Sequence, residues 1–364
     1  MFVARWVNPK AHDFYYNRVK SLLIIKLDEI GDFILLTPFL RELRRNSPQA
    51  NIELIVKPAV YNLAEMCPYV NEVLVYDWSS QGKRCSLLRR QWRALSLAVR
   101  QLRWMQFDVA IIPRWDADTY HATQLAVYSG ARAIVAFSEG CTVQKRIVNR
   151  GFDRMVSHII DEIESDGHEV SANLAILKKF GAVVESSELE IWLSPEDEEF
   201  AGAALEKRGR CVAIATGASK RYKQWPRDRF SELAIWLKER YGLTPLLFGA
   251  FGDPRLQEAV DFLGLTLRQT AAMIARCDFF VGNDSGLKHI AAAVNTPVVE
   301  INALRFGGLR VHPNSPARFR AWNVAQRIVQ PPHGTGECAI NEIPLVDVKM
   351  AVGALLTELS EGKS

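Results

Sequence analysis

The sequence predicts an α/β protein built on parallel sheets. Short apolar runs rich in β-branched residues alternate with helical patterns, which is typical of strand–helix–strand units. The alternation starts afresh after an acidic stretch, and 364 residues exceed what one ordinary core accommodates. We therefore expect two Rossmann-like domains of similar size whose sheets face an interdomain cleft, a frequent place for ligands.

Each expected element follows from its own apolar pattern. The expected strands are Leu22–Lys26, Ile52–Val56, Glu72–Tyr76, Asp108–Ile112 and Ala133–Phe137, then Val212–Thr216, Pro245–Gly249, Asp278–Gly282 and Pro297–Ile301. The expected helices are Phe33–Arg45, Leu87–Trp104, Glu169–Phe180, Pro195–Arg208, Arg229–Tyr241, Leu267–Arg276, Leu287–Val294 and Val346–Leu359. We expect one domain at residues 1–188 and another at 189–364, with the last helix able to pack back on the first domain.

Composition narrows the class of protein. Hydrophobic residues make up 48% and charged residues 24%, which excludes a disordered or collagen-like chain. No apolar run reaches about 18 residues, and the first residues lack the apolar core of a signal peptide, so we expect a cytoplasmic protein. The six cysteines form no C-x-x-C pair, so we expect reduced thiols without a zinc site.

Charge is unevenly distributed along the chain. The net charge is +4, but residues 1–150 sum to +8, residues 151–200 to −10 and residues 201–364 to +6. Basic domains attract nucleic acid, phosphorylated small molecules or an anionic membrane surface, and charge alone does not choose among them.

The first expected strand runs directly into a turn that carries acids. Gly31 permits a tight turn, and Asp32 lies at or near the N-cap of the following helix, where a carboxylate accepts backbone N–H bonds. Asp32 is therefore either a cap or, at the carboxyl end of a strand, a general base. Asp28 and Glu29 are further acids in the same loop.

Three loops of the second half are candidates for contacts with a phosphorylated ligand. Small residues and three cations follow one strand, in the run Gly217-Ala-Ser219-Lys-Arg-Tyr-Lys223, and suit either a phosphate site or a solvated basic loop. Ser285 and Gly286 open a helix whose N-terminus favours an anion, and His289 lies one turn later. Asp253 follows another strand and is either a ribose contact or part of a plain turn.

Several familiar motifs are missing. The sequence lacks G-x-x-x-x-G-K-S/T, H-E-x-x-H and G-x-S-x-G, and its one G-x-G-x-x-A does not follow an expected strand. Asp116 and Asp118 are the only D-x-D spacing considered for a metal, and this signal is weak because it lies in the first half.

A basic helix is expected between Gln81 and Phe107. This stretch has no acid and seven cations, namely Lys83, Arg84, Arg89, Arg90, Arg93, Arg100 and Arg103. Leu88, Trp92, Leu95, Val99 and Leu102 recur at helical spacing. The helix is either packed on a sheet with a solvated basic back, or a contact for anionic lipid or a phosphorylated acceptor through Arg89, Arg90 and Arg93. Nucleic acid is not favoured, because no aromatic-interleaved basic motif is present.

Three blocks of sequence together resemble one family. They read LLIIKLDEIGDFILLTPFLRELRRNSPQANIELIV, YKQWPRDRFSELA and DFFVGNDSGLKHIAAAVNTPVVEI. In order and separation they resemble glycosyltransferase family 9, the heptosyltransferase family. The resemblance implies a GT-B fold with the acceptor in the first domain and the nucleotide-sugar donor in the second. It also implies an inverting reaction without metal or cofactor, with ADP-heptose as donor and a lipopolysaccharide core or related surface glycan as acceptor.

The same resemblance assigns roles to individual residues. Its catalytic aspartate in I-G-D falls on Asp32, and its phosphate-contacting lysine in K-x-W-P falls on Lys223. The D-S/T-G-x-x-H block falls on Asp284, Ser285, Gly286 and His289, while Thr216 and Ser219 line the diphosphate loop and Asp253 is the ribose contact. A glycolipid acceptor would also require transient contact with the inner membrane.

Departures from the family pattern leave alternatives open. This chain has Asp28-Glu29 where the family often has small residues, so either acid competes with Asp32 as base. A GT-B enzyme with another sugar or acceptor, a non-catalytic nucleotide-sugar binding protein and an epimerase of the same fold are the rival interpretations.

Overall fold

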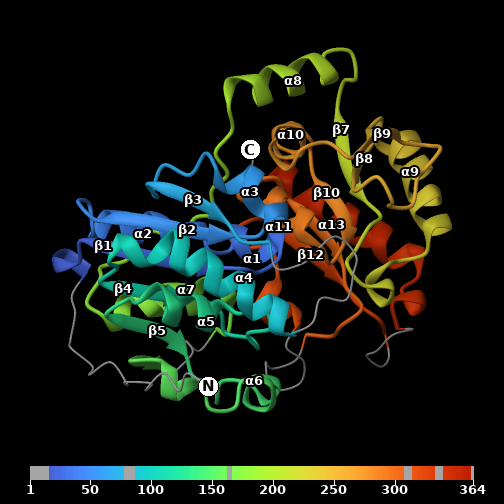
Figure 1. Ribbon diagram of the computed structural model, residues 1–364. Coiled ribbons are helices and arrows are strands. Elements are labelled where there is room, and N and C mark those ends of the chain that lie inside the picture. Colours follow the sequence, from blue (N-terminus) through green and yellow to red (C-terminus); the bar gives the residue numbers. More distant parts are fainter. Residues whose placement is uncertain (1–15, 78–86, 162–165, 307–313, 333–338, 362–364) are drawn as a thin grey trace. The chain divides into compact units, whose positions relative to one another are not determined.

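The computed structural model describes residues 16–77, 87–161, 166–306, 314–332 and 339–361 (Figure 1). The chain divides into two compact units, residues 1–187 and residues 188–364, here called unit 1 and unit 2. Each unit contains a six-stranded sheet in which all paired strands are parallel. The predicted α/β class, with two Rossmann-like sheets, is therefore confirmed.

Unit 1 is built on a buried parallel sheet. Its strands lie in the order β3-β2-β1-β4-β5-β6, and the inner strand β1 has four fully buried residues, Leu22 to Ile25. The strands are β1 (Ser21–Lys26), β2 (Asn51–Val56), β3 (Glu72–Val75), β4 (Val109–Ile112), β5 (Ala133–Phe137) and β6 (His158–Ile160). The helices are α1 (Ile30–Ile34), α2 (Thr37–Asn46), α3 (Pro58–Ala64), α4 (Leu87–Arg100), α5 (Ala122–Ser129), α6 (Val143–Val148) and α7 (Glu169–Lys179), with 3₁₀ turns η1 (Tyr16–Arg18), η2 (Leu102–Met105) and η3 (Phe152–Met155).

Unit 2 repeats this plan. Its sheet has the order β12-β11-β10-β7-β8-β9. The strands are β7 (Cys211–Ala215), β8 (Thr244–Gly249), β9 (Val260–Leu263), β10 (Phe280–Asn283), β11 (Val298–Ile301) and β12 (Gln326–Val329). The helices are α8 (Pro195–Leu205), α9 (Arg227–Tyr241), α10 (Leu267–Ile274), α11 (Gly286–Ala293), α12 (Pro316–Phe319) and α13 (Leu345–Glu361), with 3₁₀ turns η4 (Arg221–Lys223) and η5 (Ala339–Glu342). The last helix, α13, packs against β11, β12 and α9 of the same unit.

The two sheets have the same topology. Read from opposite edges, both place the first strand beside the fourth, β1 beside β4 and β7 beside β10. The chain reverses its direction of winding at this point, and side chains that follow the carboxyl ends of these strands are well placed for ligands. The loops after β1, β4, β7 and β10 are therefore the candidates for ligand contacts.

The structure departs from the expected elements in several ways. The helix expected at Phe33–Arg45 is two helices, because the chain turns at Leu35 and Leu36 and α2 begins with Thr37 and Pro38, and proline belongs in a first helical turn. The strands β6, β9 and β12 were not expected, because most of their residues are partly exposed and none is a continuous buried run, and the helices α3, α5, α6 and α12 were not expected either. Among the described residues, no helix combines the length and apolarity that crossing a bilayer requires.

Candidate active site

The loop after β7 is fastened to the loop after β8. Thr216 is buried, and its hydroxyl donates a hydrogen bond to the Pro254 carbonyl at 2.6 Å. A Cβ at Gly217 would collide with the carboxylate of Asp253, so only glycine allows this approach. The Ala250 N–H donates to Asp253 Oδ2 at 2.8 Å. Asp253 thus closes its own turn, and the Thr216 hydroxyl is occupied inside the protein, whereas Ser219 is exposed.

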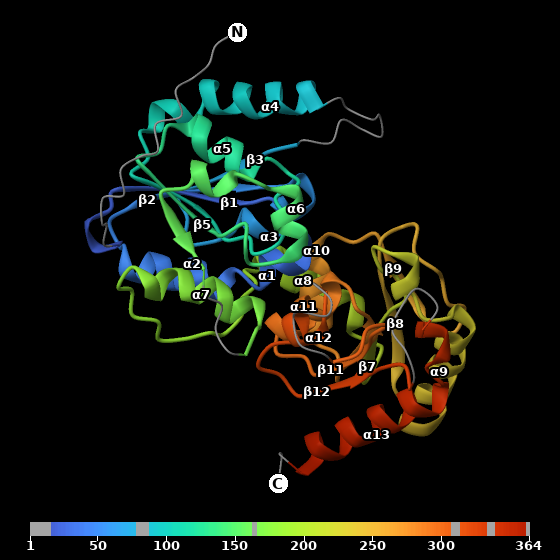
Figure 2. The ribbon, with the colours of Figure 1, turned by 90° about the horizontal axis from the view of Figure 1, so that it is seen from below.

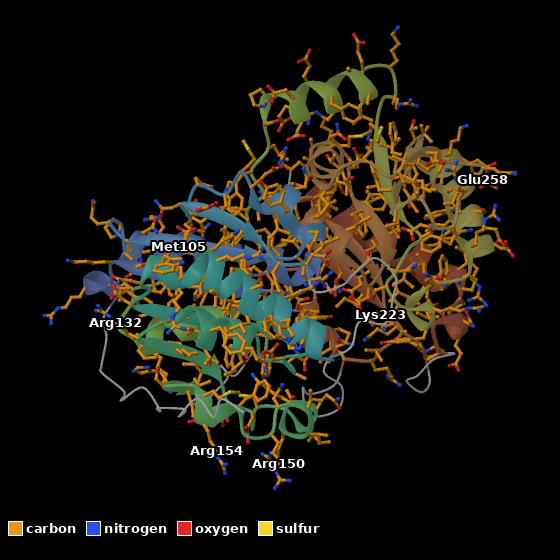
Figure 3. All side chains as sticks on the ribbon, in the orientation of Figure 1. Met105, Arg132, Arg150, Arg154, Lys223 and Glu258 are labelled. Carbon is orange, nitrogen blue, oxygen red and sulfur yellow. The ribbon has the colours of Figure 1, made fainter. Side chains whose placement is uncertain are left out.

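Asp284, which follows β10, is bound by two lysines. The Nζ of Lys223 donates to Asp284 Oδ2 at 2.6 Å, and the Nζ of Lys288 donates to Oδ1 at 2.6 Å. Lys288 is completely buried and also pairs with Glu300 at 2.5 Å, which in turn accepts a hydrogen bond from Asn302 at 2.6 Å. Lys223 keeps 13% of its side chain exposed and is labelled in Figure 3. The network therefore extends from the fully buried Lys288 and Glu300 to Lys223, which is partly exposed.

The buried charges determine the protonation of this network. Burial opposes ionisation of Asp284, but Lys288 and Lys223 outweigh it and hold the pKa of that carboxyl well below its usual range. Burial likewise disfavours the charged Lys288, yet Asp284 and Glu300 together raise the pKa of its ammonium. Burial raises the pKa of Glu300, although Lys288 opposes this shift. Asp284 is therefore a persistent anion and Lys288 a persistent cation.

Asn283 holds the adjoining backbone in position. It is completely buried, its Oδ1 accepts from the Trp225 N–H at 3.0 Å, and its Nδ2 donates to the Thr216 carbonyl at 2.8 Å. Gly282 lets β10 approach β7, since a Cβ there would lie 2.8 Å from the Ala215 carbonyl oxygen. One side chain thus ties together the ends of β7, β10 and the loop that carries Lys223.

The N-terminus of α11 lies directly after Asp284. Ser285 is its N-cap and Gly286 its first residue, as predicted. The Ser285 side chain makes no capping bond, and its buried Oγ has no hydrogen-bond partner among the residues that the structure describes. His289 is buried one turn later. Free N–H groups, a hydroxyl and the positive end of the helix dipole can together receive an anion.

In unit 1 the predicted base lies in the first turn of a helix. Asp32 is the third residue of α1 and is half-buried, while the N-cap is Glu29, which makes no side-chain capping bond. Asp32 therefore lies near the N-cap, as the sequence predicted, but at the third helical position and not at the cap itself. Its carboxylate lies at the N-terminal end of α1, just beyond the carboxyl end of β1.

The neighbouring acids are engaged elsewhere. Asp28 is buried and forms ion pairs with Arg114 and, at 3.1 Å, with Lys26. Glu29 is exposed, pairs with Lys57 at 2.6 Å and accepts a hydrogen bond from the Tyr120 hydroxyl at 3.3 Å. Asp28 is therefore held inside unit 1 by two cations, and Glu29 is paired with Lys57 at the surface.

The weak metal signal has a structural explanation. Asp118 is buried and accepts backbone N–H bonds from Tyr120, Ala122 and Thr123 at 2.8–3.1 Å, so it caps α5. Within the described residues, no three histidine, cysteine or acidic side chains cluster as a metal site would require.

The basic helix α4 is oriented differently from its expected packing. In the part of α4 whose side chains are described, residues 92–100, Ala94 and Ala98 are fully buried, whereas Trp92 and Val99 are exposed. The small residues face inward because they let α4 lie close on α5. Arg93 is exposed, with one guanidinium N–H donated to the Asp77 carbonyl at 3.2 Å. The side chains of Arg89 and Arg90 lie outside the described part.

Sequence reasoning assigned no role to Lys26, Lys288, Glu300 or Asn283. The signal for Lys288 was available, because it stands four residues after Asp284 and so on the same helical face. The sequence signal for Glu300 was weaker, namely an acid inside the apolar strand PVVEI.

Comparisons with known proteins find related sequences and related folds. The sequence model of glycosyltransferase family 9 (heptosyltransferase) matches residues 143–339, more than half of the chain. The lipopolysaccharide core heptosyltransferase OpsX of Haemophilus influenzae is 21% identical over 299 residues, covering 78% of this chain and 79% of that protein.

Solved structures share the fold. A family 9 glycosyltransferase from Veillonella parvula superposes with a TM-score of 0.75 at 19% identity, covering 96% of this chain and 100% of that one. The ADP-heptose lipopolysaccharide heptosyltransferase II of E. coli gives 0.66 at 20% identity, covering 93% and 99%. The iron-containing dodecameric heptosyltransferase TibC gives 0.53 at 14% identity, covering 96% and 78%. These likenesses establish the GT-B fold.

Proposed function

This chain belongs to glycosyltransferase family 9, and on that premise we propose that it transfers heptose from ADP-heptose to a lipopolysaccharide core or related surface glycan. The glycosyltransferase class follows from the family itself. The sugar and the acceptor follow from the names of its relatives, which are lipopolysaccharide heptosyltransferases and one ADP-heptose enzyme. Unit 2 is the donor-binding domain in this proposal, and unit 1 binds the acceptor.

Lys223 carries the donor side of the proposal. An ammonium has three N–H donors, and Lys223 Nζ uses one of them on Asp284 among the described residues. The remaining donors suit the diphosphate, together with Ser219 and the Ser285-Gly286 end of α11. His289 supports the same group from one turn further along.

The carboxylates of unit 2 suit the sugars. Asp284 retains Lys288 on Oδ1 while its Oδ2 edge receives hydroxyls of the heptose. Asp253 is the ribose contact, because its Oδ2, which accepts from the Ala250 N–H, can also accept a hydrogen bond from a ribose hydroxyl. Thr216 reaches the diphosphate loop only if its hydroxyl leaves the Pro254 carbonyl, so its first role is to hold that loop.

The reaction proposed is a single displacement with inversion. Asp32 takes the proton of the acceptor hydroxyl, the acceptor oxygen forms a bond to the anomeric carbon, and the bond from that carbon to the diphosphate breaks. ADP leaves with both electrons of the broken bond, and Lys223 with the α11 N–H groups stabilises its charge. No metal and no cofactor is needed for this charge balance.

A membrane-anchored acceptor determines the location that we propose. The enzyme would work on the cytoplasmic side of the inner membrane and meet its surface transiently. The acid-free stretch around Arg89, Arg90 and Arg93 supplies the positive charge, since each basic residue near anionic lipid contributes about 1 kcal/mol.

A donor screen tests the proposed function. Release of ADP from ADP-heptose and of UDP from UDP-hexoses is measured with and without a heptose-deficient lipopolysaccharide core. We expect ADP release that requires the acceptor and a product heavier by one heptose in mass spectrometry. Turnover of UDP-sugars alone would leave the family intact and overturn the donor assignment.

A further inference from the structure

The exposed face of α4 continues onto the 3₁₀ turn η2. Trp92 is 69% exposed, Val99 44% and Trp104 79%. Trp92 and Val99 are seven residues apart and so share one face of the helix. The indole Nε1 of Trp104 donates to the Val99 carbonyl at 3.0 Å, which fixes that ring beside the last turn. The three side chains form one apolar strip, here called the tryptophan strip.

Cations accompany this strip. Arg93, Arg100 and Arg103 are exposed, and no acid occurs from Gln81 to Phe107. Arg93 and Arg100 are also seven residues apart, so they form a second line along the helix. Figure 2 shows α4 on the outside of unit 1, above α5. Within residues 92–100 of α4, Ala94, Ala98 and the partly buried Leu97 pack against the core of unit 1, so Trp92 and Val99 lie outside that packing.

We propose that the tryptophan strip inserts into the head-group region of an anionic bilayer while the three arginines contact lipid phosphates. A helix that lies in a membrane surface has Arg or Lys on one side and Trp or Leu on the other. Indole rings prefer the boundary between water and hydrocarbon. The absence of acids from Gln81 to Phe107 makes this segment complementary to anionic lipid.

The tryptophan strip adds an apolar contact to the charge-based contact proposed above, and it rests on that proposal for the glycolipid nature of the acceptor. The two contacts respond differently to salt. Attraction between charges fades when the Debye length shrinks to about 3 Å at 1 M salt. Burial of apolar side chains does not fade, so part of the membrane binding persists at high salt.

Flotation with vesicles tests the strip. The whole protein is mixed with vesicles of phosphatidylcholine with or without phosphatidylglycerol, at low and high salt. The variant Trp92→Ser/Trp104→Ser should lose binding by about tenfold or more, since burying a large apolar side chain is worth at least 1.4 kcal/mol. The matched control Met350→Ser, an equally exposed apolar side chain on α13, should bind like the wild type.

Two further arms separate the outcomes. Trp92→Phe/Trp104→Phe keeps the rings and should retain most binding, which distinguishes insertion from a folding defect. Transfer to a water-soluble core fragment should be unchanged in all variants. If the serine variant binds vesicles like the wild type, or loses self-association instead of vesicle binding, the strip is not a membrane contact. If the wild type does not transfer heptose at all, the proposed function fails whatever the vesicles show.

Discussion

In both sheets, charged side chains form the same arrangement where the first strand lies beside the fourth. The group of that arrangement that remains exposed differs between the two units. In unit 1, Asp28 follows the first strand and pairs with Arg114, which follows the fourth. In unit 2, Lys223 follows the first strand and pairs with Asp284, which follows the fourth. Each aspartate therefore binds a cation across the junction of strands one and four.

A buried lysine completes each arrangement. Lys26 pairs with Asp28 and lies 3.5 Å from buried Glu169, and Lys288 pairs with Asp284 and with buried Glu300. Four charges thus balance in each interior, which lowers the cost of burying any one of them.

The difference lies in what is left accessible. The Arg114 guanidinium is engaged, since its Nε donates to the Ala117 carbonyl at 2.7 Å and its centre lies 5.1 Å from the Tyr120 ring. The Lys223 ammonium keeps donors beyond the one on Asp284 among the described residues, and in unit 1 the half-buried acid Asp32 follows Asp28 by four residues. Under the proposed function, the same plan presents a carboxylate to a hydroxyl in unit 1 and a cation to a diphosphate in unit 2.

The largest effect is expected from Asp32→Asn. Turnover should fall by roughly 10²–10⁴-fold, the usual contribution of a general base, while the donor dissociation constant stays near that of the wild type. Single-turnover kinetics and calorimetry with ADP measure the two quantities. Glu29→Gln, which removes the exposed acid three residues earlier, is the control and should turn over normally. Equal losses in both variants would refute Asp32 as base.

Lys288→Met should cost about 3–5 kcal/mol of the free energy of unfolding of unit 2, because it leaves Glu300 buried without its cation. Hydrogen exchange of β10 and β11 amides in urea reports this unit separately. The double variant Lys288→Met/Glu300→Leu should regain most of the loss. Lys26→Met in β1 should likewise lower the free energy of unfolding of unit 1. A change near zero for this variant would contradict the similarity between the two units.

Lys223→Ala should weaken donor binding by roughly ten- to a hundredfold, since a charge-assisted hydrogen bond is worth about 1.5–3 kcal/mol. Calorimetry with ADP measures this change. Lys220→Ala and Arg221→Ala remove exposed cations of the same loop and should do less. Equal losses in all three variants would show that Lys223 adds only general positive charge to the loop and is not a specific contact of the donor.

Lys145 and Lys288 should change the stability of the protein in opposite directions as the pH rises. Its Nζ donates to two carbonyls, of Phe137 at 2.8 Å and Arg114 at 3.0 Å, and burial lowers its pKa to about 8. Between that value and the ordinary 10.5 the unfolded chain binds more protons, so Lys145 makes stability rise with pH. Lys288, whose pKa is raised, contributes stability that is lost as pH rises through its folded value. Denaturant titrations across this range should show Lys145→Met removing the upward contribution; an unchanged slope would contradict it.

The smallest effect is expected from chelators. In the proposed site, Lys223 and the N–H groups of α11 balance the diphosphate charge, so we expect EDTA and iron-selective chelators to leave turnover nearly unchanged. Inactivation that Mg²⁺, Mn²⁺ or iron reverses would show that unit 2 does not balance the donor charge by itself.

Local sequence alone predicted the parallel α/β plan and the loops of the site. Strands such as Ala133–Phe137 are continuous apolar runs, and Ser285-Gly286 carries its own helix-start signal, so both were predictable from neighbouring residues. The edge strands β6, β9 and β12 escaped prediction because most of their residues are partly exposed and do not form a continuous apolar run, so that pairing with a neighbour makes them strands.

Tertiary structure decided the pairings and the exposed faces. Glu300 reaches Lys288 because β11 lies beside β10, and Asp28 reaches Arg114 because β4 lies beside β1. Periodicity favoured the large residues of α4 as its buried face, but close approach to α5 selected Ala94 and Ala98 and left Trp92 outside. Periodicity reports which residues share a face, whereas the space available at the neighbouring element determines which face is buried.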